Sequence, residues 1–330
     1  MKALVLTSPG AIEIIEIDKP ECGEGEVLVK MEAAALNKRD QFIREGKYPN
    51  IELNSVLGSD GVGEVVELGA GVDKKWSGQK VIINPNRDWG PDKDVQGREY
   101  SILGMPSHGT FSEYVKVPAH RVHRMPQGLS SEEAAALPLA GLTAYRACFH
   151  HGKITQGAHV LISGFGGGVA QFAFQFSIAV GAKVYVTSGR PEKINMALDM
   201  GAAGGFNYKL PNWYKNPWQT KGGFDVVIDS AGGDQVNSFL KIMRPGGRVV
   251  FYGATNGLPS SIDLYRMFWN QITLQGSTMG NDTEFVEMLR FVEKHDIKPL
   301  LSSVKPFDDI VESFNEIAKP SKMGKVVVKF

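Results

Sequence analysis

The residues best placed to do chemistry form a glycine-dense turn near the middle of the chain. The turn comprises Gly164, Gly166, Gly167, Gly168 and Val169. Residues 159–163 before it are apolar and suit a buried strand, while the apolar positions between 169 and 180 recur at helical spacing. Glycines let the backbone approach a ligand closely, and free N–H groups at a helix start stabilise a pyrophosphate. The stretch therefore predicts a dinucleotide-binding βαβ unit.

The end of the next strand indicates which dinucleotide binds. Residues 183–188 have a strand pattern, and the position about 20 residues beyond the glycines is Ser188 rather than a carboxylate. Arg190 and Lys193 follow it. A carboxylate would bond the ribose 2′-OH of NAD, whereas a hydroxyl and two cations suit a 2′-phosphate. The sequence favours NADPH; the alternative is that both cations are solvated residues in the helix that starts at Pro191.

Strands and helices continue to alternate after this unit. Residues 224–230 and 247–253 have buried-strand patterns with a helix over 234–243 between them, which predicts a parallel, doubly wound sheet. Ligands bind at the carboxyl ends of such strands. That rule adds five cofactor-facing positions, namely Ser230, Ala231, Gly253, Ala254 and Thr255.

The first 125 residues differ, because they consist of short β patterns separated by turn formers. Residues 84–107 carry three Pro and three Gly, and we expect a long surface excursion there. Ser130 or Ser131 could cap a helix, and Asp282 or Thr283 another that runs to His295. The final strand is expected to rejoin the N-terminal domain. The predicted domains are 1–125 with 282–330, and 126–281.

Composition excludes several classes of partner. The 330 residues include 36 basic and 36 acidic ones, so the formal net charge is zero. The chain as a whole therefore has no excess positive charge to attract nucleic acid or an anionic membrane. The apolar run at the N-terminus is far shorter than a signal peptide requires, and no run approaches membrane-spanning length. Two cysteines in a chain of this size fit a reducing compartment. We expect a cytoplasmic protein.

The order of parts resembles the medium-chain dehydrogenase/reductase superfamily, and within it the zinc-independent, quinone-oxidoreductase-like branch. Besides the βαβ unit, the resemblance rests on four motifs, at residues 36–40, 57–63, 109–114 and 141–145. It implies an α/β chain with a GroES-like, β-rich catalytic domain made from both ends and a Rossmann domain between them. It also implies a homodimer or homotetramer, often formed through the edge of the Rossmann sheet.

The resemblance also predicts that no metal is bound. Zinc-dependent members place a Cys at the position of Asn37, a His-Glu pair at Ser59 and Asp60, and a Cys or Asp near residues 139–140; none of these ligands is present. Residues 84–107 resemble the lobe that holds structural zinc but contain no cysteine. His120 and His123 lack a third ligand nearby, so we expect ordinary solvated histidines.

Without a metal, hydride transfer to a quinone or conjugated carbonyl needs hydrogen-bond donors and a proton. By resemblance, Asn37 lines the nicotinamide end of the cleft and Thr143 contacts the nicotinamide. Asp40 fixes the loop carrying Asn37, or has a local cap role. Tyr48 lines the pocket wall, where it could pack or donate a proton. Tyr208 matches a position that touches the 2′-phosphate in relatives; the rival interpretation is a buried or stacking tyrosine.

The resulting hypothesis is an NADPH-dependent, zinc-independent reductase of a small-molecule quinone or α,β-unsaturated carbonyl. Two other functions stay open. One is a non-catalytic NADPH-binding protein with a regulatory or structural role, since no acid or base is unmistakable in the sequence. The other is an atypical alcohol dehydrogenase.

Overall fold

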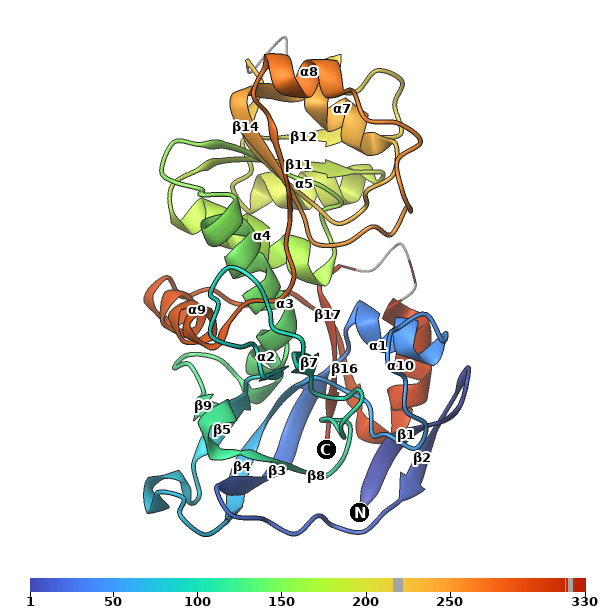
Figure 1. Cartoon of the computed structure of the whole chain (residues 1–330), viewed down its shortest axis with the longest axis vertical. Coiled ribbons are helices and arrows are strands. Elements are labelled where there is room, and N and C mark those ends of the chain that lie inside the picture. The colour runs from blue at the N-terminus through green and yellow to red at the C-terminus, as the bar shows by residue number, and fades with distance from the viewer. Residues whose placement is uncertain (216–221, 318, 320–322) are drawn as a thin grey trace. The chain divides into compact units, whose positions relative to one another are not determined.

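The computed structural model describes residues 1–215, 222–317, 319 and 323–330. These residues form two compact units: unit 1 is Met1–Leu142 with Gly280–Phe330, and unit 2 is Thr143–Met279 (Figure 1). The division near residue 142 lies later than the expected boundary at residue 125. The reason is that helix α2 (Ser131–Ala135) packs on strands β3 (Glu26–Ala35) and β4 (Asp60–Leu68) of unit 1.

Unit 1 is built on a sheet of seven strands. Its order is β16 (Leu301–Pro306), β17 (Lys325–Lys329), β3, β4, β5 (Lys80–Ile83) and β9 (Val122–Arg124), with β8 (Tyr114–Pro118) paired to β3. A hairpin of β1 (Lys2–Ser8) and β2 (Ala11–Glu16) adds a second small sheet. β17 runs antiparallel to β3, with Val328 opposite Ala34, so the last strand does rejoin the N-terminal part of the chain.

Two helices of unit 1, α2 and α9, begin at side-chain caps. Helix α1 (Lys38–Arg44) follows β3, α9 (Asp282–Lys294) opens the C-terminal segment, and α10 (Ile310–Ile317) precedes β17. Ser130 caps α2 through Glu133. The cap of α9 is Asn281, not Asp282 or Thr283, because only Asn281 has a glutamate three residues on: it accepts from Glu284 N at 2.9 Å, and Glu284 accepts from its N–H at 2.8 Å.

The segment 84–107 is not wholly a surface excursion. It is exposed from residue 90 to 99, but its ends pair as β6 (Asn86–Arg87) and β7 (Ser101–Ile102). Asn86 is fully buried, and Leu103 and Met105 fill the core of unit 1. The expectation failed because isolated apolar residues among turn formers give no periodic signal.

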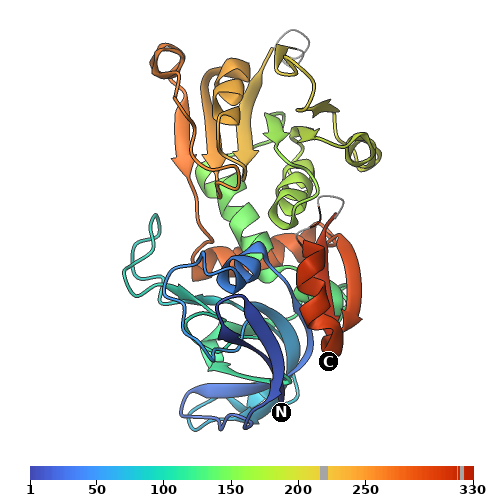
Figure 2. The same cartoon turned by 90° about the vertical axis from the view of Figure 1, so that its right-hand side faces the viewer.

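Unit 2 is a parallel six-stranded sheet. Its order is β12 (Gly204–Asn207), β11 (Lys183–Ser188), β10 (His159–Ile162), β13 (Phe224–Asp229), β14 (Met243–Phe251) and β15 (Thr273–Gly276). The connecting helices include α4 (Gly168–Ala179), α5 (Pro191–Asp199), α7 (Gln235–Ile242) and α8 (Leu264–Trp269) (Figures 1 and 2). The strand order reverses between β10 and β13, which is where such sheets bind ligands. The predicted doubly wound sheet is confirmed.

Across the described ranges, no helix combines the length and apolarity needed to cross a bilayer.

Candidate functional site

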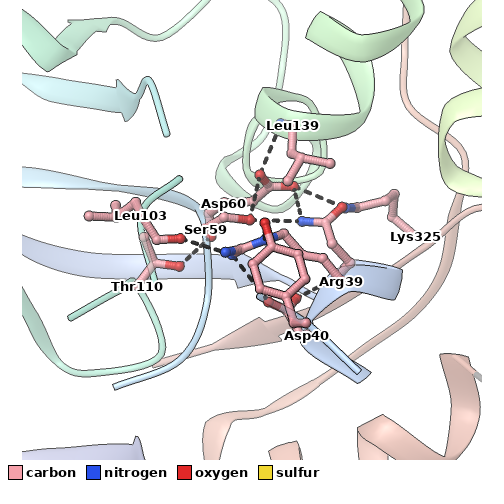
Figure 3. Close-up of polar contacts among 10 residues, drawn as sticks. Arg39, Asp40, Ser59, Asp60, Leu103, Thr110, Leu139 and Lys325 are labelled. Atoms are coloured by element: carbon pink, nitrogen blue, oxygen red, sulfur yellow. Dashed lines mark hydrogen bonds and ion pairs between the residues drawn. The ribbon is translucent and has the colours of Figure 1, made fainter. Parts of the chain in front are cut away.

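A buried polar cluster in unit 1 joins β3, β4 and β17; we call Asn37, Ser59, Asp60 and Lys325 the Asp60 cluster. Asn37 lies just beyond β3, at the start of α1, and its Nδ2 donates to Asp60 Oδ2 at 2.8 Å and to Ser59 Oγ at 3.2 Å. Lys325, the first residue of β17, donates from Nζ to Asn37 Oδ1 and, at 3.0 Å, to Asp60 Oδ2 (Figure 3). The backbone N–H of Leu139 donates to Asp60 Oδ1 at 2.9 Å.

Water has almost no access to this cluster. Asp60 is 0% exposed, Lys325 3% and Asn37 6%. Burial of either charge alone would be costly, so the ammonium and the carboxylate stabilise each other. Lys325 was not singled out from the sequence, because there it is simply the first residue of an apolar strand. Only the pairing of β17 with β3 brings it to Asn37.

Asp40 holds the backbone of Asn37 from the first turn of α1. Its Oδ2 accepts from Asn37 N at 2.7 Å, so the two roles considered for Asp40, a cap and a support for Asn37, are one interaction. Its Oδ1 lies 3.8 Å from Arg39 Nη1. Asp40 is fully buried, and this burial raises its pKa to about 6, although the Arg39 charge and the hydrogen bond from Asn37 oppose the rise.

Tyr48 lies against the Arg39 guanidinium. Its hydroxyl accepts from Arg39 Nε at 3.3 Å, and its ring centre is 4.8 Å from Arg39 Cζ. Arg39 is 8% exposed, and its Nη1 also donates to Leu103 O at 3.0 Å. Tyr48 is half-buried and packs against the core of unit 1, so a packing role is present. Arg39 was missed because a charged residue at a helix start is normally solvated.

We expect Asp40 to make stability fall with rising pH. Its folded-state pKa of about 6 is above the ordinary 3.8, so the folded chain binds this proton more tightly than the unfolded chain. The contribution is fully present below about pH 3.8 and is lost as the pH rises through about 6. Asp40→Asn keeps an acceptor for Asn37 N and removes the titration.

The measurement is urea unfolding of wild type and Asp40→Asn at several pH values. The free energy of unfolding of wild type, relative to the variant, should fall by about 2 kcal/mol between pH 4 and 7. The other carboxylates contribute the same pH dependence to wild type and to the variant, so their contributions cancel in the comparison. A difference that does not change with pH contradicts the prediction.

The glycine turn in unit 2 has the expected open backbone. Gly164 and Gly166 have φ of +61° and +118°, a region that favours glycine, and α4 begins at Gly168. A Cβ on Gly166 would lie 2.6 Å from Lys193 Nζ, so the Lys193 ammonium lies over the turn. The turn and this cation together form a cradle that suits a phosphate.

The residues predicted to choose the cofactor gather at the end of β11. Ser188 Oγ accepts from Arg190 N at 3.2 Å. A Cβ on Gly189 would lie 2.9 Å from Tyr208 Oη and 2.7 Å from Lys209 Cε. Tyr208 is 39% exposed, so it is not a buried tyrosine, and of the rival interpretation only a stacking role stays a prediction. Burial, and then the Arg190 charge, lower the pKa of Lys193. Lys209 was missed, although it follows Tyr208 directly.

The turns after β13 and β14 meet each other. Thr255 N donates to Ser230 O at 3.2 Å, which joins the two turns that contain the predicted positions Ser230, Ala231, Gly253, Ala254 and Thr255. Buried Asp229 shapes the first turn, since its Oδ2 accepts from Ala231 N at 3.1 Å and from Gly232 N at 2.8 Å. Its role was not predicted, because an acidic residue at a strand end has no local signature.

The four predicted catalytic residues fall in both units. Asn37, Asp40 and Tyr48 lie near one another in unit 1, linked through Arg39 and the Asn37–Asp40 hydrogen bond. Thr143 belongs to unit 2, where it is 6% exposed in helix α3 (Pro138–Tyr145) and its Oγ1 lies 3.7 Å from Met279 Sδ.

The side chains present do not fit a zinc ion. Within the described ranges, no group of three or more His, Cys, Asp or Glu side chains could hold a metal. Of the four residues of the Asp60 cluster, only Asp60 has a side chain of a type that binds zinc, and the Lys325 ammonium contacts it. His120 is exposed as expected, but His123 is only half-exposed: its ring centre lies 5.2 Å from that of Phe285, and burial lowers its pKa to about 4.

Comparison with known proteins agrees with the two units. Residues 23–127 match the model of the alcohol dehydrogenase GroES-like domain, and residues 168–294 match that of the zinc-binding dehydrogenases. The chain is 36% identical to the zinc-type alcohol dehydrogenase-like protein YogA of Leptosphaeria maculans, covering 96% of this chain and 94% of that one.

Solved structures of similar proteins agree with the same two-unit fold. An NAD-dependent alcohol dehydrogenase has a TM-score of 0.94 at 34% identity, with both chains fully covered. The quinone oxidoreductase of Thermus thermophilus, solved also with NADPH, has a TM-score of 0.80 at 28% identity, again over both whole chains.

A GroES-like unit combined with a parallel Rossmann unit defines a class of oxidoreductase that binds a nicotinamide cofactor. The chain belongs to the medium-chain dehydrogenase/reductase superfamily.

Proposed function

We propose that this oxidoreductase uses NADPH to reduce a quinone or an α,β-unsaturated carbonyl compound without zinc. The Asp60 cluster is the observation that carries the proposal. Zinc needs at least three protein ligands from Cys, His and carboxylate. Of the positions where zinc-dependent relatives are expected to hold ligands, only Asp60 has such a side chain, and it contacts Lys325. Reactions whose charge can be met by hydrogen-bond donors suit this site better than metal-assisted alcohol oxidation.

The residues of unit 2 fit a nicotinamide dinucleotide, which supplies a hydride when bound. The turn 164–168 and the start of α4 bind its pyrophosphate, assisted by Lys193, which the sequence assigned to the 2′-phosphate but which lies over Gly166. Ser188, Arg190 and Tyr208 bind the 2′-phosphate of NADPH, since β11 ends without a carboxylate. The turns 230–233 and 253–255 form the rest of the cofactor site, and Thr143 contacts the nicotinamide.

The test combines metal analysis with turnover. We expect the purified chain to hold substoichiometric zinc, and to oxidise NADPH with quinones or enones at a rate that a chelator leaves unchanged. A chain that binds NADPH and reduces none of these acceptors is a non-catalytic binding protein. Stoichiometric metal with oxidation of simple alcohols identifies an atypical alcohol dehydrogenase instead. Either result overturns the proposal.

We further propose a homodimer formed through the edge of the parallel sheet. Among the described residues, β15 is an edge strand of the sheet, and neighbouring α8 exposes Tyr265 and Trp269 at 72% each and Phe268 at 62%. Figure 2 shows both elements in orange at one side of the sheet. An unpaired edge beside exposed aromatic side chains is unfavourable in water, and a second copy would cover it.

The double variant Tyr265→Glu/Trp269→Glu is expected to be monomeric, because it places two charges in the proposed interface. Size-exclusion chromatography with light scattering measures the mass. Leu198→Glu on α5, 44% exposed in wild type and at the opposite end of the sheet, is the control that should keep the dimer. A wild-type monomer contradicts the proposal. A wild-type tetramer would need a second interface in addition to this one.

We also propose a cytoplasmic location with no nucleic-acid or membrane partner. Cys22 and Cys148 are both free thiols, as a reducing compartment allows.

A further inference from the structure

The side chain of Asn37 has no hydrogen left for a substrate. An amide nitrogen carries two hydrogens, and those of Asn37 Nδ2 go to Ser59 Oγ and Asp60 Oδ2. A half-turn of the side-chain amide would lose these hydrogen bonds. Its Oδ1, which accepts from Lys325, would then face the carboxylate of Asp60. Asn37 therefore cannot donate to a substrate oxygen in this arrangement.

Lys325 is the member of the cluster with a hydrogen to spare. An ammonium has three hydrogens, and two of them go to Asn37 Oδ1 and Asp60 Oδ2. The described residues show these two acceptors for it, and its tetrahedral geometry directs the third hydrogen away from both. Since Lys325 is only 3% exposed, water screens its charge weakly, and a hydrogen bond from it to an anion is stronger than at a surface.

The cluster also holds Lys325 in place. Asp60 is bound by Asn37, Ser59, Lys325 and the backbone of Leu139, so the carboxylate that anchors the ammonium is fixed from several sides. A donor that is already oriented costs no reorganisation when charge develops on its acceptor. Such preorganisation is what a site without a metal needs.

We propose that Lys325, rather than Asn37, donates the hydrogen bond to the substrate oxygen that becomes negative during reduction. The assignment rests on the function proposed above. NADPH, when bound, would supply a hydride with its electron pair to the β-carbon of an enone or to the ring of a quinone, and NADP+ would remain. The carbon–carbon π pair shifts toward the carbonyl carbon, and the carbonyl π pair moves to oxygen. Lys325 stabilises that oxyanion, and a proton from water then completes the product.

The main alternative is that Lys325 only neutralises Asp60. The test therefore compares two variants that differ in the ammonium alone, Asp60→Asn and Lys325→Met/Asp60→Asn. Neither variant leaves a buried unpaired carboxylate at position 60, and in Asp60→Asn the ammonium keeps Asn37 Oδ1 as an acceptor and can use the oxygen of the new amide. Lys329→Met changes an exposed lysine on the same strand and is the matched control, expected to behave as wild type.

We expect the double variant to have a kcat about 100-fold or more below that of Asp60→Asn, the usual effect of removing one oxyanion donor. The dissociation constant of NADPH and the circular dichroism spectrum should match between the two. Equal kcat in both variants, within threefold, overturns the assignment of Lys325 while the proposed function stands. A wild type that reduces no quinone or enone instead contradicts the proposed function.

A second readout does not depend on turnover. 4-Nitrophenol absorbs differently as phenol and phenolate, and its phenolate oxygen resembles the developing oxyanion. In the presence of NADP+, the pKa of the bound phenol should be about one unit or more lower with Asp60→Asn than with the double variant. The same pKa in both variants overturns the assignment.

Discussion

Lys325→Met is expected to lower the free energy of unfolding by about 3–5 kcal/mol, the usual result of breaking a buried ion pair from one side. Asp60 is fully buried and keeps its neutral donors from Asn37, Ser59 and Leu139, but loses the cation 3.0 Å away. An uncompensated carboxylate in a poorly solvated site is the physical source of the loss.

Lys325→Met/Asp60→Asn should recover most of that stability, since both charges are then absent. Urea unfolding followed by far-UV circular dichroism measures both variants, with Lys329→Met as control. Lys329 pairs with Glu132 at an exposed position, where such pairs contribute about 0–1 kcal/mol. Equal losses in the single and double variants would show that the buried ion pair is not the cause.

Arg190→Ala is expected to weaken NADPH binding by roughly 10- to 100-fold and to leave NADH binding nearly unchanged. The loss corresponds to one charge-assisted hydrogen bond, about 1.5–3 kcal/mol, that only the 2′-phosphate can accept. Arg190 is exposed and its backbone N–H bonds Ser188, so its removal disturbs little else.

Lys193→Ala should behave differently, because the Lys193 ammonium lies over Gly166 in the turn that binds the pyrophosphate of either cofactor. It should weaken NADPH and NADH alike. Titration of protein fluorescence gives both dissociation constants, and Lys183→Ala, at the exposed opposite end of β11, is the control. If wild type binds the two cofactors equally, the 2′-phosphate assignment is wrong.

The parallel sheet was predictable because its signals are local. β11 has the predicted bounds, Lys183–Ser188, and α4 begins one residue before Val169. A strand buried on both faces is a continuous apolar run, a helix repeats every 3.6 residues, and glycines separate the two. These patterns need no knowledge of distant residues.

The segment 84–107 shows where local signals fail. Leu103 and Met105 are buried because they contact strands and helices far away in sequence, not because of their neighbours. The cap of α9 is a different case, because the glutamate three residues after Asn281 was a local signal, and the prediction of Asp282 or Thr283 overlooked it.

By itself, the sequence determined the Rossmann unit, its glycine turn, the basic end of β11 and the missing zinc ligands, since each depends on residue types at short spacing. The tertiary structure alone decided what surrounds Asn37. Lys325 is 288 residues from Asn37 and Asp60 is 23, and these separations carry no periodic signal. Only the antiparallel pairing of β17 with β3, and of β3 with β4, brings an ammonium, an amide and a carboxylate into one buried cluster.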